Sequence, residues 1–177
     1  FTGEVAAVFL AKLGVQYVIV GHSERREIFG ESDADVSKKI TTVQKLNMYP
    51  IVCVGETLEE REAGKTTEKV MGQVRAALVG RTVEQVCNMV IAYEPIWAIG
   101  SGQAASPEVA AAVARALRSE TSSSSLRILY GGSVDGRSAA GFLSATGEGS
   151  LNGLLIGGAS LQAERLLEIA TAVGVAS

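Results

Sequence analysis

The sequence is poor in the residues from which metal centres and disulfide frameworks are built. Its 177 residues include one histidine, His22, and two cysteines, Cys53 and Cys87. These three side chains are well separated along the chain and cannot supply a usual ligand set for a metal ion. Two cysteines in a chain of this length also do not make a disulfide framework. We therefore expect no metal site and no disulfide-dependent fold.

The sequence also lacks an excess of positive charge and any long apolar run. It has 16 Lys and Arg against 19 Asp and Glu, a formal net charge of −3. Binding to nucleic acid or to an anionic membrane requires a basic face. No apolar run approaches the roughly 18 residues of a membrane span, and nothing resembles a signal peptide. We therefore expect a cytoplasmic protein with no nucleic-acid partner and no membrane partner.

What the sequence does contain is a regular alternation of short apolar runs and amphipathic stretches. Such an alternation is typical of repeated βα units and hence of a parallel sheet. The predicted strands are residues 15–20, 49–54, 88–93, 126–130 and 153–156, and the predicted helices are residues 4–13, 35–46, 66–79, 107–117 and 161–173. Ser106 and Ser160 are expected to cap the last two of these helices. No linker or low-complexity segment interrupts this pattern, so residues 1–177 are predicted to form a single domain.

Two architectures fit consecutive βα units, an open doubly wound sheet and a (β/α)8 barrel. An open sheet that binds a dinucleotide would carry G-x-G-x-x-G after its first strand, and no predicted strand is followed by that spacing. A barrel needs eight strands and about 250 residues. The chain begins at Phe1 rather than Met, and its first helical stretch has no strand before it. We expect a partial TIM barrel that holds about the last five βα units, with the first three strands missing.

Chemistry in a parallel sheet gathers at the carboxyl ends of the strands, and two polar residues lie there. His22 follows the first predicted strand, just before a short helix whose positive end disfavours an imidazolium. Glu94 follows the third strand, where partial burial would raise its pKa towards that of a general base. A structural histidine and a rim carboxylate paired with a lysine remain the alternatives. Cys53, inside the second strand, is interpreted as a buried small hydrophobe.

Glycine-rich turns end the last two predicted strands, at residues 131–133 and 157–160. Paired glycines let backbone N–H groups approach an anion, and a following helix adds a favourable dipole. Two such turns on the last two strands favour a phosphate site, because barrels bind phosphate there. The apolar loop after Glu94, which contains Ile96, Trp97 and Ile99, is either buried or a lid over a ligand.

Four segments together resemble the triosephosphate isomerase family. They are residues 21–26 (GHSERR), 92–100 (AYEPIWAIG), 130–134 (YGGSV) and 155–160 (LIGGAS), and the resemblance runs from Phe1 to the end of the chain. It implies a cofactor-free interconversion of dihydroxyacetone phosphate and glyceraldehyde 3-phosphate through an enediolate. It also implies a homodimer, because residues 1–4 match the trailing half of a loop that inserts into the partner subunit.

The resemblance assigns a role to each of eight residues. Glu94 matches the general base and His22 the neutral electrophile that polarises the carbonyl. The substrate-binding positions are Gly100, Ser133, Gly157 and Gly158, and the supporting positions are Glu24 and Tyr130, the latter as a partner of the closed lid.

The sequence departs from the family pattern at several points. The Asn-x-Lys of the family's first strand, with its catalytic lysine, has no counterpart in this chain. Ser101, Gln103 and Ala104 replace common lid residues, and Asn152 replaces a frequent aspartate. The alternatives are therefore a catalytically silent fragment or another phosphate-binding barrel enzyme. We expect the chain alone to be nearly inactive and poorly soluble until a complementing segment of about 75 residues supplies the missing strands.

Overall fold

The computed structural model describes residues 2–99, 104–121, 125–145 and 147–174 and contains one parallel sheet in that part of the chain. Its strands are β1 (Tyr17–Val20), β2 (Tyr49–Val54), β3 (Val90–Tyr93), β4 (Arg127–Tyr130) and β5 (Gly153–Leu154). Each strand pairs in parallel with the next one along the chain, so their spatial order is β1-β2-β3-β4-β5. This sequential order is that of a βα barrel, whereas a doubly wound sheet reverses its order at a switch point.

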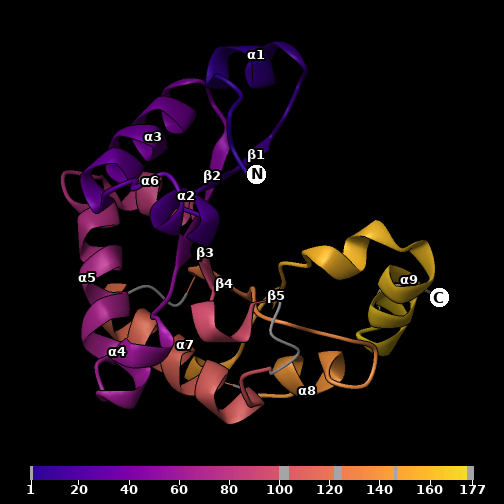
Figure 1. Cartoon of the computed structure of the whole chain (residues 1–177). Coiled ribbons are helices and arrows are strands. Elements are labelled where there is room, and N and C mark those ends of the chain that lie inside the picture. The colour runs from indigo at the N-terminus through magenta and orange to yellow at the C-terminus, as the bar shows by residue number, and fades with distance from the viewer. Residues whose placement is uncertain (1, 100–103, 122–124, 146, 175–177) are drawn as a thin grey trace.

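The helices follow the strands and form an arc around one side of the sheet (Figure 1). The arc is made by α3 (Asp33–Lys45), α5 (Thr66–Leu78) and α7 (Pro107–Thr121), each packed against its neighbour, and continues through α8 (Ala139–Leu143) to α9 (Ala163–Ala172). The shorter helices are α1 (Ala7–Lys12), α2 (Ser23–Glu27), α4 (Leu58–Glu62) and α6 (Val83–Cys87), with 3-10 turns η1 (Ile96–Ala98), η2 (Gly147–Gly149) and η3 (Gly158–Leu161). The alternation of strand and helix that the sequence predicts is confirmed.

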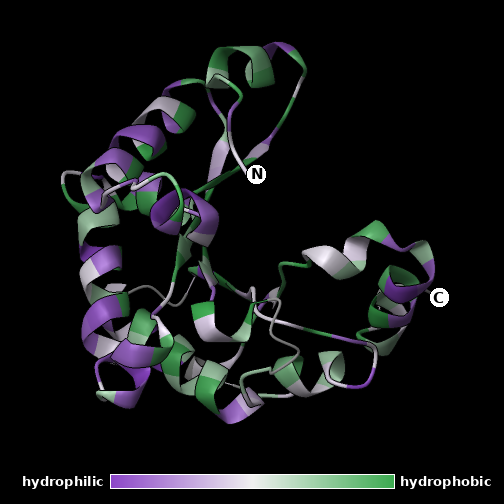
Figure 2. Ribbon diagram, viewed as in Figure 1, coloured by the Kyte–Doolittle hydropathy of each residue, from purple (hydrophilic) through white to green (hydrophobic). Residues whose placement is uncertain are grey.

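The hydrophobic core lies between the sheet and the helix arc. Alternate residues of each strand face the helices, among them Val52, Ile91 and Ile128, and all three are fully buried. They meet the apolar stripes of the helices, and the opposite helix faces are hydrophilic (Figure 2). Burial of these stripes is the main stabilising contribution to such a layer.

The other face of the sheet is apolar but partly exposed near β1. Tyr17 and Ile19 of β1 are 43 % and 36 % exposed, and Tyr49 of β2 stacks on Tyr17 with ring centroids 5.2 Å apart. In β3 every residue is buried, because that strand has neighbours on both sides and helices behind it. The near-continuous hydrophobicity of the strands therefore reflects a sheet with two apolar faces, as in a barrel.

Several local predictions differ from the structure in detail. Four of the five strands are shorter than predicted, and α4, α6 and α8 were not predicted. Ser106 does cap α7, since its hydroxyl accepts from the Val109 amide at 3.4 Å. Ser160 was expected to cap the last helix, and this was wrong. Its hydroxyl donates to the Gly157 carbonyl at 2.7 Å inside η3, so that α9 begins after Gln162 without a side-chain cap.

Asn152 links the helix arc to the edge of the sheet. Its Oδ1 accepts from the Ile128 amide at 2.8 Å and from the guanidinium of Arg118 on α7 at 3.2 Å. An aspartate at this position could accept the same two hydrogen bonds, so Asn152 differs from it in carrying no charge. No helix in the described part of the chain has the length and apolar character that crossing a membrane requires.

Candidate active site

His22 lies at the junction of β1 and α2, where it is the N-cap residue of the short helix. Its Nδ1 accepts from the backbone N–H of Glu24 at 3.2 Å. A ring nitrogen that accepts a hydrogen bond carries no proton, so the pattern assigns the proton of the neutral ring to Nε2. The Nε2 atom lies 3.4 Å from Oε1 of Glu94. The hydrogen bond to Nδ1 that caps α2 therefore leaves Nε2, the ring nitrogen nearer Glu94, as the donor atom of the imidazole.

Glu94 follows β3 directly and is almost completely buried, with 3 % of its surface exposed. Its Oε2 accepts from the backbone N–H of Ser23 at 3.3 Å. Burial raises the pKa of Glu94 above its ordinary value of 4.5, against the opposing effects of His22 and of the Ser23 hydrogen bond. A rim carboxylate paired with a lysine, the alternative left open by the sequence, does not fit, because Glu94 is buried and the basic groups that act on its pKa are His22 and Arg26.

Two glycines on the neighbouring strands make room for Glu94. A Cβ on Gly55, at the end of β2, would lie 1.8 Å from the Glu94 carbonyl oxygen. A Cβ on Gly131, at the end of β4, would lie 2.8 Å from Cγ of Glu94. The glycines are therefore needed for the close approach of neighbouring strands around the carboxylate. The sequence analysis assigned Gly131 only to a phosphate turn and gave Gly55 no role.

Cys53 is buried, as expected, but it also contacts the carboxylate. Cys53 and Glu94 line the same small cavity, and burial, with the nearby charge of Glu94, raises the pKa of Cys53 well above its ordinary value. Cys53 is therefore a neutral thiol beside the carboxylate rather than a nucleophile. Sequence reasoning missed this contact because the two residues lie on different strands.

The glycine-rich turns of β4 and β5 face one another across a pocket of about 310 Å³. Ser133, Gly157 and Gly158 all line it, together with Ile99 and Gly132. A Cβ on Gly157 or Gly158 would meet no atom within 4 Å, so open space lies directly above these two residues. The sequence-predicted phosphate residues that the structure describes are thus brought to one pocket.

Ser133 and Tyr130 hold the two ends of the apolar loop that follows Glu94. The hydroxyl and the amide of Ser133 both donate to the Ala98 carbonyl, at 2.6 and 3.1 Å. The buried hydroxyl of Tyr130 accepts from the Ala105 amide at 3.1 Å. Gly100, the remaining predicted substrate residue, lies outside the described residues.

Glu56 is a buried carboxylate that the sequence analysis did not single out. Its Oε1 accepts from the Tyr93 hydroxyl at 3.1 Å and from the Trp97 indole N–H at 3.0 Å. The guanidinium of Arg61 lies over the Trp97 ring at 4.2 Å. The start of the loop is therefore tied to the end of β2, one residue after Gly55. The only signal in the sequence was the polar residue directly after an apolar strand.

Glu24 is placed beside His22 and supports it from outside the pocket. Its backbone N–H holds the His22 ring, and its Oε2 accepts from the Thr2 amide at 2.7 Å, which lowers the pKa of Glu24. In the described part of the chain no group of three or more His, Cys, Asp and Glu side chains could hold a metal ion.

The consecutive βα units, with a histidine and a buried glutamate at the carboxyl ends of the strands, place this chain in the class of βα-barrel enzymes. Residues 1–173 match the family model described as triosephosphate isomerase. The chain is 48 % identical to a triosephosphate isomerase of Pediococcus pentosaceus over 96 % of its own length and 69 % of that protein. It is 47 % identical to a triosephosphate isomerase of Alcanivorax borkumensis, over 97 % of this chain and 71 % of the relative. The chain belongs to the triosephosphate isomerase family, as its motifs indicated.

Replacement of Glu94 by glutamine is expected to stabilise the fold in a pH-dependent way. Because the pKa of Glu94 is raised on folding, the folded parent binds this proton more tightly than the unfolded chain does. Its free energy of unfolding therefore falls as the pH rises from 4.5 to the raised pKa. Glutamine does not titrate, so the free energy of unfolding of Glu94→Gln does not fall in this way. The difference in the free energy of unfolding between the variant and the parent should therefore rise across that pH window and then level off.

Urea unfolding followed by circular dichroism at a series of pH values measures this difference. Glu59→Gln, at an exposed position of α4, is the matched control. A difference between Glu94→Gln and the parent that did not change with pH would show that Glu94 titrates as a solvated carboxylate.

Proposed function

We propose that this protein interconverts dihydroxyacetone phosphate and glyceraldehyde 3-phosphate. Its family membership makes it an isomerase, and the relatives carry the name of this reaction. The observation that carries the proposal is the convergence of His22 Nε2 and the Glu94 carboxylate, 3.4 Å apart, beside a glycine-lined pocket. The proposal treats residues 1–177 as a single partial barrel domain.

Glu94 acts as the base that moves a proton between the two adjacent carbons of the substrate. Its carboxylate takes the proton from one carbon and returns it to the other, so that it ends each cycle ionised. The raised pKa supports this role, because a base whose pKa lies nearer the operating pH accepts a carbon-bound proton more readily. The Ser23 amide and the Cys53 thiol hold the carboxylate in place between transfers.

His22 stabilises the negative charge that develops on the substrate oxygen. A neutral imidazole with its proton on Nε2 donates a hydrogen bond to that oxygen while Glu94 holds the carbon-bound proton. The Nε2 proton then passes to this oxygen, and Nε2 takes the hydroxyl proton of the adjacent carbon, so that the enediolate charge moves to the oxygen that becomes the new carbonyl. The backbone of α2 fixes this tautomer through the hydrogen bond from the Glu24 amide to Nδ1. The preorganised donor supplies its stabilisation without reorientation during the reaction.

The phosphate of the substrate occupies the pocket between the turns of β4 and β5. Gly157 and Gly158 expose their backbone there, and Ser133 lies on the opposite wall. An anion is recognised by backbone N–H groups at such turns without the need for a cationic side chain. Ile99 belongs to the loop after Glu94 and also lines this pocket, so a bound phosphate would lie beside the loop as well as the two turns.

The reaction is tested most directly by shortening the base by one methylene. Glu94→Asp withdraws the carboxylate by about 1 Å, which is expected to lower kcat on the order of 100-fold while KM changes little. The chain is assayed with glyceraldehyde 3-phosphate after it is joined to the part of the Pediococcus relative that the match leaves uncovered. Glu59→Asp is the control, and equal single-turnover rates for Glu94→Asp and the parent would exclude Glu94 as the base.

The phosphate pocket is tested by filling the space above Gly157. Gly157→Val places a side chain where a Cβ meets no protein atom, so the fold is retained but the anion is obstructed. Affinity for phosphoglycolate is expected to fall about tenfold or more, corresponding to about 1.4 kcal/mol or more. Calorimetry measures it, and Gly72→Val on α5, where a Cβ also meets open space, is the control. Unchanged affinity in Gly157→Val would place the phosphate elsewhere.

We also propose that the protein works as a cytoplasmic homodimer. The segment before and within α1 exposes several large apolar side chains, which a second subunit would cover. They are Val5, Val8, Phe9 and Leu13. Sedimentation of the joined chain should give the mass of two copies, and Phe9→Glu should lower it to one. A single-copy mass for the unsubstituted chain at micromolar concentration would contradict the dimer.

A further inference from the structure

Arg26 lies behind the proposed catalytic pair and takes no part in the reaction as described above. Its side chain is only 12 % exposed. Its Nε donates to the Gly21 carbonyl at 2.8 Å, its Nη2 to the Cys53 carbonyl at 3.4 Å and its Nη1 to Asp33 at 2.5 Å. Burying a cation is costly unless it is paired and hydrogen-bonded. These acceptors therefore hold the guanidinium in one place.

One backbone acceptor adjoins His22, and the other belongs to β2, the strand that pairs with β3 and so with the strand that leads into Glu94. Gly21 is the residue directly before His22, and Cys53, on β2, carries the thiol that contacts Glu94. Gly21 has a φ of 68°, and a Cβ there would lie 3.1 Å from Nη2 of Arg26. The guanidinium thus packs directly on the turn that leads into His22 and joins it to the end of β2.

Arg26 also shares a cavity with the base. A space of about 10 Å³, enough for roughly one water molecule, is lined by Arg26, Glu94, Cys53, Gly21 and Ser23, among others. The charge of Arg26 lowers the pKa of Glu94 and so opposes the effect of burial. One side chain therefore contacts the backbone directly before His22 and the backbone of Cys53, and its charge acts on the Glu94 carboxylate.

We propose that Arg26 is a positioning residue that fixes the ends of β1 and β2, so that His22 and Glu94 converge on the substrate. The inference rests on the proposed function. The groups that face Glu94 are His22 and Arg26 from the β1–α2 segment and Cys53 from β2. Asp33 of α3 faces Arg26, and Glu24 lies 3.9 Å from His22 Nδ1.

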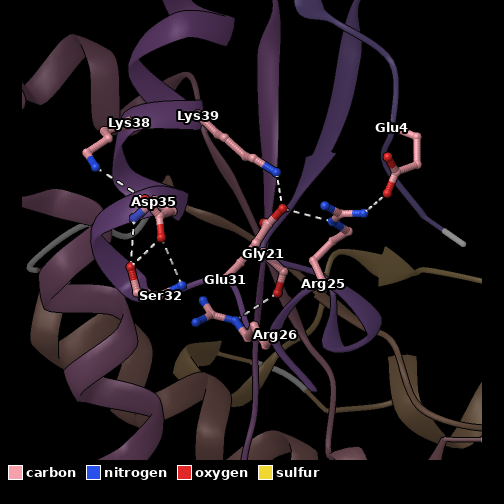
Figure 3. A network of polar contacts seen from close by, with 9 residues as sticks. All are labelled: Glu4, Gly21, Arg25, Arg26, Glu31, Ser32, Asp35, Lys38 and Lys39. Carbon is pink, nitrogen blue, oxygen red and sulfur yellow. Dashed lines mark hydrogen bonds and ion pairs between the residues drawn. The ribbon is translucent and has the colours of Figure 1, made fainter. Parts of the chain in front are cut away.

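The neighbouring arginine supplies a matched control. Arg25 belongs to the same helix, but its side chain meets Glu4 and Glu31 (Figure 3). Its guanidinium also lies over the Phe29 ring at 4.0 Å. Figure 3 shows the Arg26 side chain directed instead to Gly21. Arg25→Gln and Arg26→Gln remove the same charge from adjacent positions of α2, so only the geometry differs between them.

The experiment uses the fact that the chain has a single histidine, which gives one set of imidazole signals. Two-dimensional ¹H–¹⁵N spectra of the ¹⁵N-labelled chain, completed by an unlabelled segment that supplies the missing strands, follow His22 from acid to neutral pH without substrate. The Nε2 signal reports the ionisation of the adjacent Glu94, identified by its loss in Glu94→Gln. Arg26→Gln should displace the Nε2 signal and move the Glu94 midpoint upward by roughly half a unit to one unit. Arg25→Gln should leave both unchanged.

Two further variants separate positioning from fold stability. Arg26→Lys keeps the charge but not the planar fork, so it should restore the Glu94 midpoint and leave the imidazole displaced. Asp33→Asn releases one arm of Arg26 and should produce a smaller displacement in the same direction, even if Arg26→Gln does not fold. In the joined chain, Arg26→Gln should lower kcat about tenfold with little change in KM, a loss of about 1.4 kcal/mol.

The outcomes are distinguishable from failure of the proposed function, because the spectra need no turnover. Equal effects of Arg25→Gln and Arg26→Gln on His22 would show that α2 is merely destabilised, and this would overturn the inference. An unchanged His22 spectrum in Arg26→Gln, or in Asp33→Asn where Arg26→Gln does not fold, would overturn it as well. In both cases an active joined chain would leave the isomerase proposal standing.

Discussion

The arrangement of the site depends on the burial of one carboxylate, that of Glu94. A buried carboxylate is stable only where donors surround it, and the surrounding donors come from segments far apart in the sequence. Ser23 donates its amide to the carboxylate, the imidazole Nε2 of His22 lies 3.4 Å from it, and Cys53 lines the same small cavity. These contacts require β1, β2 and β3 to end at the same level, so the register of the parallel sheet is part of the chemistry.

The fold supplies that register through the helices behind the sheet. Alternate residues of β2, β3 and β4 face the helices, where contact with α3, α5 and α7 fixes them. A slip by one residue would exchange the two faces of a strand and carry Glu94 to the helix side. Core packing therefore acts on catalysis indirectly, by excluding every register but one. The glycines at positions 55 and 131 are compatible only with that register, since a side chain at either would collide with Glu94.

The sequence predicted the elements that depend on local pattern. Apolar runs located the five strands, and their carboxyl ends located His22, Glu94 and the glycine turns, which the structure brings to one edge of the sheet. Contacts between strands could not be predicted in this way. The thiol of Cys53 and the guanidinium of Arg26 reach the site only through pairing of β1, β2 and β3. The failed Ser160 cap has a different cause, because a nearer carbonyl, that of Gly157, takes the hydroxyl first.

The base and the loop that follows it are held by adjacent residues of one strand end. The hydroxyl of Tyr93 donates to Glu56, which also accepts from the indole of Trp97 in the loop. Glu94 directly follows Tyr93 in the chain. Burial raises the pKa of Tyr93 far above its ordinary value, so its hydroxyl remains a donor at every physiological pH. Movement of Trp97 away from Glu56 would remove a donor from a fully buried carboxylate. Leaving this position therefore costs the loop one hydrogen bond to a buried carboxylate that still accepts from Tyr93 and Thr66, which makes Glu56 a restraint on loop motion directly beside the proposed base.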